Sequence, residues 1–235
     1  MNDLHLISNS TVLKNLLGIT NEKELDLAEA ELSRANMMLL YENGFSDFSS
    51  SGFCFIHKFL FGDVYEWAGQ YRKINIQKRE ELLAGRSVWY SNVTEIGADL
   101  DKVFAEIKKI DWASLTREDF AKQIARLFPK LWQVHPFREG NTRTTVMMMT
   151  FFVERYGYYF DQNLMAESAG YVRDSFVLAS LGEHSEYEHL EKILLDAICI
   201  EPVDYDVTIV DENQKERYEK YKSKDYTPTK HEYIE

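Results

Sequence analysis

The amino-acid sequence predicts an all-α, mostly helical fold that carries one small β-hairpin. Apolar residues recur at helical spacing along most of the chain, and glycine or asparagine often marks the ends of these runs. The alternation of polar and apolar residues that is typical of a strand is confined to residues 72–90. The length of 235 residues, with 45% hydrophobic and 28% charged residues, fits a globular chain with a core of its own.

The N-terminal part of the chain is expected to form three helices. The pattern predicts a short helix over Ser10–Leu17, ended by Gly18, and a longer helix over Asn21–Asn43 in which Asn21 is the N-cap. Ser51–Phe61 carries apolar residues on most of its sides, so we expect a buried helix there.

The following stretch, about residues 72–90, changes character. Lys73, Ile74, Asn75, Ile76 and Gln77 alternate between polar and apolar, which predicts a short strand. A turn at Gly85–Ser87 and a second strand at Val88–Tyr90 would complete a hairpin, the one piece of β-structure that the sequence predicts.

Helical spacing then resumes up to residue 200. The expected helices are Asn92–Ile110, Thr116–Gln133, Asn141–Tyr156, Leu164–Leu181 and Ser185–Ile200. We therefore expect an N-terminal extension over residues 1–9, one domain over 10–201 and a charged C-terminal tail over 202–235, which is rich in Asp, Glu, Lys and Tyr.

Composition excludes several classes of function. The net charge of -12 disfavours binding to nucleic acid, whose phosphates repel such a surface. No apolar run is long enough for a membrane span, and the N-terminus lacks the features of a signal peptide. We expect a cytoplasmic protein, or an effector that another machine exports. Cys54 and Cys199 lie in apolar surroundings that are typical of buried, reduced thiols.

The chemistry of the chain is expected in the segment His135–Thr144, which reads His-Pro-Phe-Arg-Glu-Gly-Asn-Thr-Arg-Thr. A Gly-Asn turn at the start of a helix can direct backbone N–H groups and positive dipole character toward an anion. Glu139 supplies oxygen for Mg²⁺, Arg143 a planar fork for phosphate, and His135 a base that works near neutral pH. The combination suits the handling of a polyphosphate.

The same segment resembles the signature of the Fic family, His-x-Phe-x-Asp/Glu-Gly-Asn-Gly-Arg-x-x-Arg. Thr142 replaces the second glycine, and Val146 stands where the second arginine is usual. The segments Gly18–Asn21 and Leu60–Gly69 also resemble the entry part of Fic domains, so the likeness covers about residues 10–200. It implies a mostly helical domain that transfers AMP from ATP to a Ser, Thr or Tyr hydroxyl of a target protein.

The resemblance also implies a role for each residue of the signature. His135 would be the general base, and Glu139 would hold Mg²⁺ against the phosphates of ATP. The remaining residues that would bind the nucleotide phosphates are Arg138, Gly140, Asn141, Thr142 and Arg143, the last at the terminal phosphate. The stretch Lys73–Gln77 would be the flap that docks an extended segment of the target.

An inhibitory glutamate is a further expectation that follows from the resemblance. Many Fic proteins carry a helix with the pattern Ser/Thr-x-x-x-Glu-Gly/Asn, and Thr208, Glu212 and Asn213 match it. The usual partner of that glutamate is the second arginine, which is Val146 here, so Arg143 would have to substitute. The tyrosines of the tail are candidate sites of self-modification.

Two alternative functions stay open on the sequence alone. The first keeps the fold and changes the reaction to removal of AMP or transfer of another phosphate-containing group. The second is a non-catalytic module that binds a nucleotide or a partner, and it would not depend on His135. The sequence leaves open the target protein and whether the chain is a monomer or a dimer.

Overall fold

The computed structural model describes residues 3–202, and within them the chain is mostly helical, with eight α-helices and one two-stranded sheet. The helical fold that the sequence predicts is thereby confirmed. The described chain divides into two compact units. The first comprises residues 3–75, 90–110 and 134–155, and the second comprises residues 76–89, 111–133 and 156–202.

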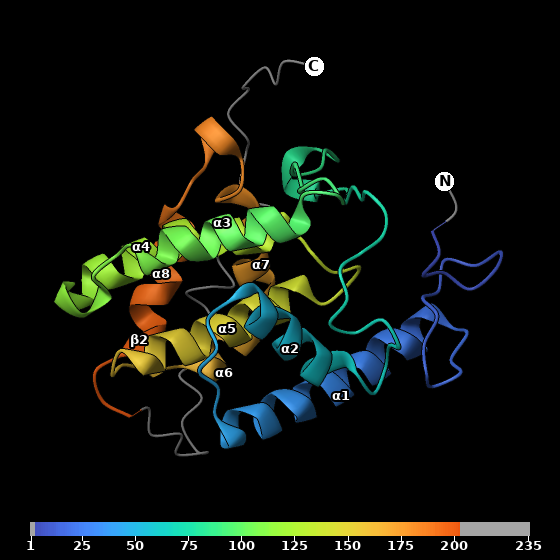
Figure 1. Cartoon of the computed structure of the whole chain (residues 1–235), viewed down its shortest axis with the longest axis horizontal. Coiled ribbons are helices and arrows are strands. Elements are labelled where there is room, and N and C mark those ends of the chain that lie inside the picture. Colours follow the sequence, from blue (N-terminus) through green and yellow to red (C-terminus); the bar gives the residue numbers. More distant parts are fainter. Residues whose placement is uncertain (1–2, 203–235) are drawn as a thin grey trace. The chain divides into compact units, whose positions relative to one another are not determined.

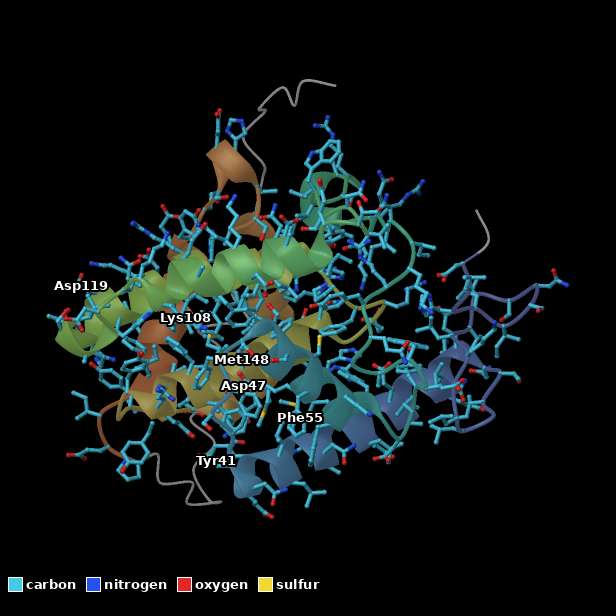
Figure 2. The ribbon with its side chains drawn as sticks, viewed as in Figure 1. Tyr41, Asp47, Phe55, Lys108, Asp119 and Met148 are labelled. Carbon is cyan, nitrogen blue, oxygen red and sulfur yellow. The ribbon has the colours of Figure 1, made fainter. Side chains whose placement is uncertain are left out.

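The first unit is built around a central apolar helix. Its helices are α1 (Glu22–Asn43), α2 (Ser50–Phe61), α3 (Ile96–Lys108) and α5 (Asn141–Arg155). Helix α2 packs against the other three and lies between α1 and α5 in Figure 1. Met148 of α5 is fully buried, whereas Tyr41 of α1 and Phe55 of α2 are 40% and 50% exposed (Figure 2). The core of this unit therefore lies along the buried faces of α2 and α5.

The boundaries of α1 and α2 follow from side-chain caps. The side chain of Asn21 accepts the N–H of Glu24 at 3.2 Å, as the sequence predicts, and Ser49 accepts the N–H of Gly52 at the same distance. Gly44 ends α1 with φ of +72° and donates its N–H to the carbonyl of Leu40. These contacts satisfy backbone groups that a helix end would otherwise leave exposed.

The second unit contains the remaining helices and the sheet. The helices are α4 (Arg117–Val134, whose last residue belongs to the first unit), α6 (Gln162–Glu167), α7 (Ala169–Leu178) and α8 (Glu188–Ala197). Strand β1 (Tyr159–Phe160) pairs in antiparallel fashion with β2 (Ile198–Cys199). The predicted helix Leu164–Leu181 is thus divided at Ser168, and the last helix ends at Ala197 because the chain enters β2. Three short 3₁₀ turns are Glu81–Leu83, Trp112–Ser114 and Gly182–His184.

The predicted helix at Ser10–Leu17 is wrong. This segment folds back on the residues before it, with N–H of Ile7 on the carbonyl of Val12 and N–H of Lys14 on the carbonyl of His5. The hydroxyl of Ser10 accepts the N–H of Val12 at 3.0 Å and so stabilises a turn. In a helix the N–H of Lys14 would bind the carbonyl of Ser10, so its bond to His5 replaces the helical pairing.

The predicted hairpin at residues 72–90 is also wrong in detail. Within residues 3–202, neither Lys73–Gln77 nor Val88–Tyr90 is a strand, and the sheet is formed by β1 and β2 instead. The N–H of Lys78 binds the hydroxyl of Ser87 at 3.1 Å, and a 3₁₀ turn at Glu81–Leu83 follows. At Lys78 a side-chain hydroxyl therefore takes the place of a backbone carbonyl as the acceptor. The alternation itself is present, since residues 73, 75 and 77 are exposed and residues 74 and 76 are half-buried.

None of the helices in the described part of the chain combines the length and the apolar character that crossing a membrane requires.

Candidate active site

The signature segment forms a loop that leads from the end of α4 into α5, and all of it belongs to the first unit. Asn141, the first residue of α5, closes this loop. Its Oδ1 accepts the N–H of Phe137 at 3.0 Å, and its Nδ2 donates to the carbonyl of Phe137 at 2.9 Å. The side chain is buried. Asn141 therefore shapes the loop, because both the oxygen and the nitrogen of its amide bind the backbone of Phe137.

Gly140 is required by its surroundings as well as by its conformation. Its φ is +82°, in the left-handed region that favours glycine. A Cβ at this position would lie 2.4 Å from the ring of Phe61. The packing of Phe61 of α2 beneath the loop is thus a reason for glycine that the sequence alone does not show.

His135 lies at the beginning of the loop, in a strained and enclosed position. Its φ is +50°, which is unusual for a residue with a side chain, and it is 2% exposed. The ring of Tyr90 lies against its imidazole, with 4.1 Å between the ring centroids. Strain of this kind persists where neighbouring contacts hold the backbone in place.

Those contacts come from Arg72, which the sequence did not single out. Its guanidinium donates from Nε to the carbonyl of His135 at 2.8 Å, from Nη1 to the carbonyl of Ile74 at 2.7 Å, and from Nη2 to the carbonyl of Ser91. The N–H of Arg72 donates to the carbonyl of Pro136 at 2.8 Å. Burial lowers the pKa of this guanidinium below its usual range. No sequence pattern marks an arginine whose partners are backbone carbonyl groups.

The other end of the loop is held by an ion pair. Arg143 on α5 donates from Nη2 to the carboxylate of Glu29 and from Nη1 to the hydroxyl of Ser33 at 2.7 Å. Glu29 and Ser33 are buried residues of α1. The guanidinium carbon of Arg143 also lies 4.7 Å from the centre of the Phe61 ring. The sequence did not predict Glu29 as a partner of Arg143.

Tyr65 completes this cluster by donating its hydroxyl to Glu29. Burial raises the pKa of Tyr65 well above its usual value, and the charge of Glu29 raises it further. The phenol therefore stays protonated and remains a donor. Glu29 thus accepts a guanidinium and a phenol together, which is a strong arrangement for a buried carboxylate.

A pocket of about 490 Å³ lies beside this cluster. Its walls come from residues 11–13, the first turns of α1, Tyr65 and the signature residues Arg138, Glu139 and Arg143. The volume is in the range of sites for nucleotide-sized ligands. Arg138 pairs with Asp3 at 2.7 Å on the same side. Three of the predicted ligand-binding residues therefore meet at one pocket, and His135 does not line it.

The donor set suits a magnesium ion that is shared with phosphate. An oxygen of the Glu139 carboxylate accepts the N–H of Gly140 at 3.2 Å. Residues 3–202 contain no cluster of three or more metal-ligating side chains. Mg²⁺ commonly takes one or two carboxylates and completes its shell with substrate phosphates and water, so Glu139 beside a bound phosphate would suit this ion.

Comparison with known proteins identifies the family. A model of the Fic/DOC family matches residues 47–153. The chain is 32% identical over 154 residues to "Probable protein adenylyltransferase y4lH" of Sinorhizobium fredii, which covers 65% of this chain and 76% of that protein. The chain therefore belongs to the Fic/DOC family.

Two further relatives agree with this assignment. The chain is 31% identical to a "Protein adenylyltransferase" of Bartonella henselae over 79% of its own length, although it spans only 36% of that protein. Among solved structures, the N-terminal Fic domain of a Bartonella quintana effector protein has a TM-score of 0.68 at 25% identity. That match covers 83% of this chain and 91% of the Bartonella quintana chain.

Proposed function

We propose that this chain transfers AMP from ATP to a hydroxyl group of a target protein. The observation that carries the proposal is the loop between α4 and α5, because it gathers Arg138, Glu139 and Arg143 at one nucleotide-sized pocket and holds His135 at its start. The relatives that are named adenylyltransferases support the same reaction.

The reaction requires positioning more than covalent chemistry. The hydroxyl oxygen of the target attacks the α-phosphorus of ATP in line, and the bond from that phosphorus to the bridging oxygen breaks. Pyrophosphate leaves, and His135 takes the hydroxyl proton. Effective catalysis then depends on how firmly the protein holds the base and the phosphates.

The start of α5 is assigned to the phosphates. Backbone N–H groups of Asn141 and Thr142 and the helix dipole attract the anion, and the N–H of Gly140 joins them when it leaves the carboxylate of Glu139. Arg143 binds the terminal phosphate. Glu139 would hold Mg²⁺, which supplies neutralisation of the phosphate charge. Arg138 lines the pocket and is available for phosphate once Asp3 is displaced.

The extended segment Lys73–Gln77 is assigned to docking of the target. Its alternating exposure and lack of an assigned sheet partner among the described residues suit pairing with an extended peptide. The carbonyl of Ile74 is bound by Arg72, which also binds the carbonyl of His135. One guanidinium therefore connects the docking segment with the proposed base.

The proposal is tested with α-labelled ATP and Mg²⁺, with the chain itself and a cell lysate as acceptors. We expect label on protein with the wild type and a loss of about 10²-fold or more with His135→Ala. His184→Ala, which alters an exposed histidine, is the control and should label as the wild type does. Equal labelling by wild type and His135→Ala would contradict the assignment, and release of AMP from a pre-modified protein would favour the reverse reaction.

Inhibition by Glu212 remains a separate part of the proposal. Thr208, Glu212 and Asn213 lie outside the described residues. Arg143, the partner that the resemblance leaves for Glu212, is already paired with Glu29. If Glu212 restrains the enzyme, Glu212→Gly raises labelling strongly, and unchanged labelling would remove this idea. Self-modification of the tail tyrosines is a second idea, and mass spectrometry that finds these tyrosines unmodified would remove it.

A further inference from the structure

A second histidine contacts the signature loop and has no role in the reaction described above. His57 lies in α2 and is fully buried. Its Nδ1 lies 2.8 Å from the backbone nitrogen of Gly69, and its Nε2 lies 2.9 Å from the carbonyl oxygen of Glu139. The ring therefore bridges the segment after α2 and the residue that is proposed to hold Mg²⁺.

The two contacts fix the tautomer of His57. A backbone N–H can only donate, so Nδ1 must offer its lone pair to Gly69. The proton of a neutral ring then resides on Nε2, and Nε2 donates it to the carbonyl of Glu139. Burial lowers the pKa of His57 to about 3, which agrees with a neutral ring.

Both the ring and its far contact are held rigidly. The imidazole stacks on Phe137 with 3.8 Å between centroids and an interplanar angle of 21°, and it also lies against Phe61. Gly69 has φ of +78°, and a Cβ there would lie 2.7 Å from the Cβ of Lys58. Gly69 is therefore pressed against α2, and His57 has little freedom to move.

The contact with Glu139 determines where the next N–H points. The peptide unit between Glu139 and Gly140 is planar, and its C=O and N–H point in opposite directions. The hydrogen bond from His57 fixes the C=O, so the N–H of Gly140 is directed away from His57. This N–H donates to the carboxylate of Glu139. One buried ring thus orients both the backbone donor and, through it, the carboxylate.

We propose that His57 is a positioning residue that orients the Glu139–Gly140 peptide for binding of Mg²⁺ and phosphate. The inference rests on the proposed function, because it takes Glu139 as the magnesium ligand and Gly140 as part of the phosphate site. His57 acts through the carbonyl of Glu139 and touches neither substrate nor metal. Groups that orient a metal ligand typically change metal affinity by about 10–100-fold when they are removed.

Two amide variants separate the two hydrogen bonds of His57. His57→Asn places an amide oxygen near the position of Nδ1, where it can accept the N–H of Gly69, but it is too short to reach Glu139. His57→Gln extends an amide N–H toward the position of Nε2 and loses the contact with Gly69. Each variant gives up one of two similar hydrogen bonds, so their melting temperatures should be similar.

The experiment measures binding of a fluorescent ATP analogue to the full chain as Mg²⁺ is titrated. We expect His57→Asn to raise the Mg²⁺ concentration for half-maximal binding by about tenfold or more, and His57→Gln by about threefold or less. The same order should appear in AMP transfer. If the two folded variants shift the Mg²⁺ dependence equally, or not at all, His57 has a purely structural role and the inference is overturned.

Glu139→Gln distinguishes this failure from failure of the proposed function. If Glu139→Gln raises the Mg²⁺ concentration for half-maximal binding while His57→Asn leaves it at the wild-type value, only the inference fails. If Glu139→Gln and the wild type respond alike to Mg²⁺, the proposed metal role of Glu139 fails, and the role of His57 fails with it. If His57→Asn does not fold, His57→Gln still tests the inference. A rise of tenfold or more in its Mg²⁺ concentration for half-maximal binding would overturn the inference.

Discussion

The two ends of the signature loop are held by different chemistry. At the His135 end, the anchor is Arg72, whose guanidinium binds neutral backbone carbonyl groups. At the Arg143 end, the anchor is the carboxylate of Glu29, which already carries the negative charge that a phosphate would bring. Under the proposed function, the end with the base His135 (the base end) is set before a substrate arrives. The end with Arg143 (the phosphate end) has to exchange one anion for another.

The two anchors are therefore expected to affect different properties, the position of His135 at one end and the affinity for phosphate at the other. The carbonyl groups that Arg72 binds belong to residues that do not line the pocket, so these contacts can persist through the reaction and keep His135 in place. The pair of Arg143 and Glu29 is a charge-assisted contact in which the carboxylate is buried and the guanidinium is partly exposed, and a bound phosphate must compete with it. We expect substitutions at the base end to affect turnover and substitutions at the phosphate end to affect binding.

The largest effect is expected for Arg72→Met. The variant leaves the carbonyls of His135, Ile74 and Ser91 without this donor, so we expect the free energy of unfolding to fall by about 3 kcal/mol or more. In the protein that remains folded, AMP transfer should fall by about 10²-fold with little change in ATP affinity, because the base is no longer held. Urea unfolding and transfer of labelled AMP measure the two effects.

Arg72→Lys and Arg79→Met are the controls for this prediction. Lysine keeps the charge but lacks the planar fork, so Arg72→Lys should remain well below the wild type in transfer. Arg79 is exposed, and Arg79→Met should change neither quantity. Full transfer by Arg72→Lys would show that the charge, and not the three-way contact, is what the base end requires.

The same comparison explains what the sequence could predict. Helices α1, α2 and α5 and the loop between α4 and α5 were predicted because periodicity, caps and the signature residues are local features. Arg72 and Glu29 were not, because each meets the loop through contacts between residues far apart in the sequence. Their partners are a backbone carbonyl and a guanidinium on another helix, and neither leaves a local pattern.

The two segments that were predicted wrongly fail for a related reason. At Ser10–Leu17, the N–H of Lys14 binds the carbonyl of His5 and not that of Ser10, as it would in a helix. Next to Lys73–Gln77, the hydroxyl of Ser87 takes the N–H of Lys78. Periodicity reports which side chains face the core, but it does not report which acceptor a backbone N–H finds. The alternation over residues 73–77 therefore predicted exposure correctly and the hydrogen-bond pattern wrongly.

A smaller effect is expected for Glu29→Gln, which tests the phosphate end. The amide can still accept from Tyr65 but no longer neutralises Arg143, so the guanidinium becomes a better partner for phosphate. We expect the Kd for ATP with Mg²⁺ to fall by about threefold to tenfold, since a charge-assisted contact is worth roughly 1 kcal/mol. Equilibrium binding of a fluorescent ATP analogue provides the measurement.

Glu31→Gln is the matched control, because Glu31 is an exposed residue of the same helix and should leave the Kd unchanged. A Kd that rises tenfold in Glu29→Gln would reverse the interpretation. Glu29 would then hold Arg143 in the orientation that phosphate needs. Both ends of the loop would then be positioned before the substrate binds.

The smallest effect is expected for Asp3→Asn, which removes the ion-pair partner of Arg138 in the middle of the loop. Asp3 pairs with Arg138, and the pair is mostly shielded from water. Burial alone would raise the pKa of Asp3, but hydrogen bonds from the backbone of His5 and from Arg138 outweigh it and lower the pKa. A lowered folded-state pKa means that the pair stabilises the protein above the unfolded pKa of 3.8, and that this stability is lost as the pH falls through the folded value.

At neutral pH we therefore expect Asp3→Asn to cost about 1 kcal/mol or less in unfolding free energy, and this cost should vanish in strong acid. Freed from Asp3, Arg138 should bind phosphate only slightly better, by about twofold, because its side chain is 21% exposed and solvent weakens its interaction with an anion. Urea unfolding at neutral and acidic pH, together with ATP binding, measures both effects. A change in Kd as large as that of Glu29→Gln would mean that Arg138, and not Arg143, is the main phosphate ligand. The main phosphate contact would then lie in the middle of the loop and not at its Arg143 end.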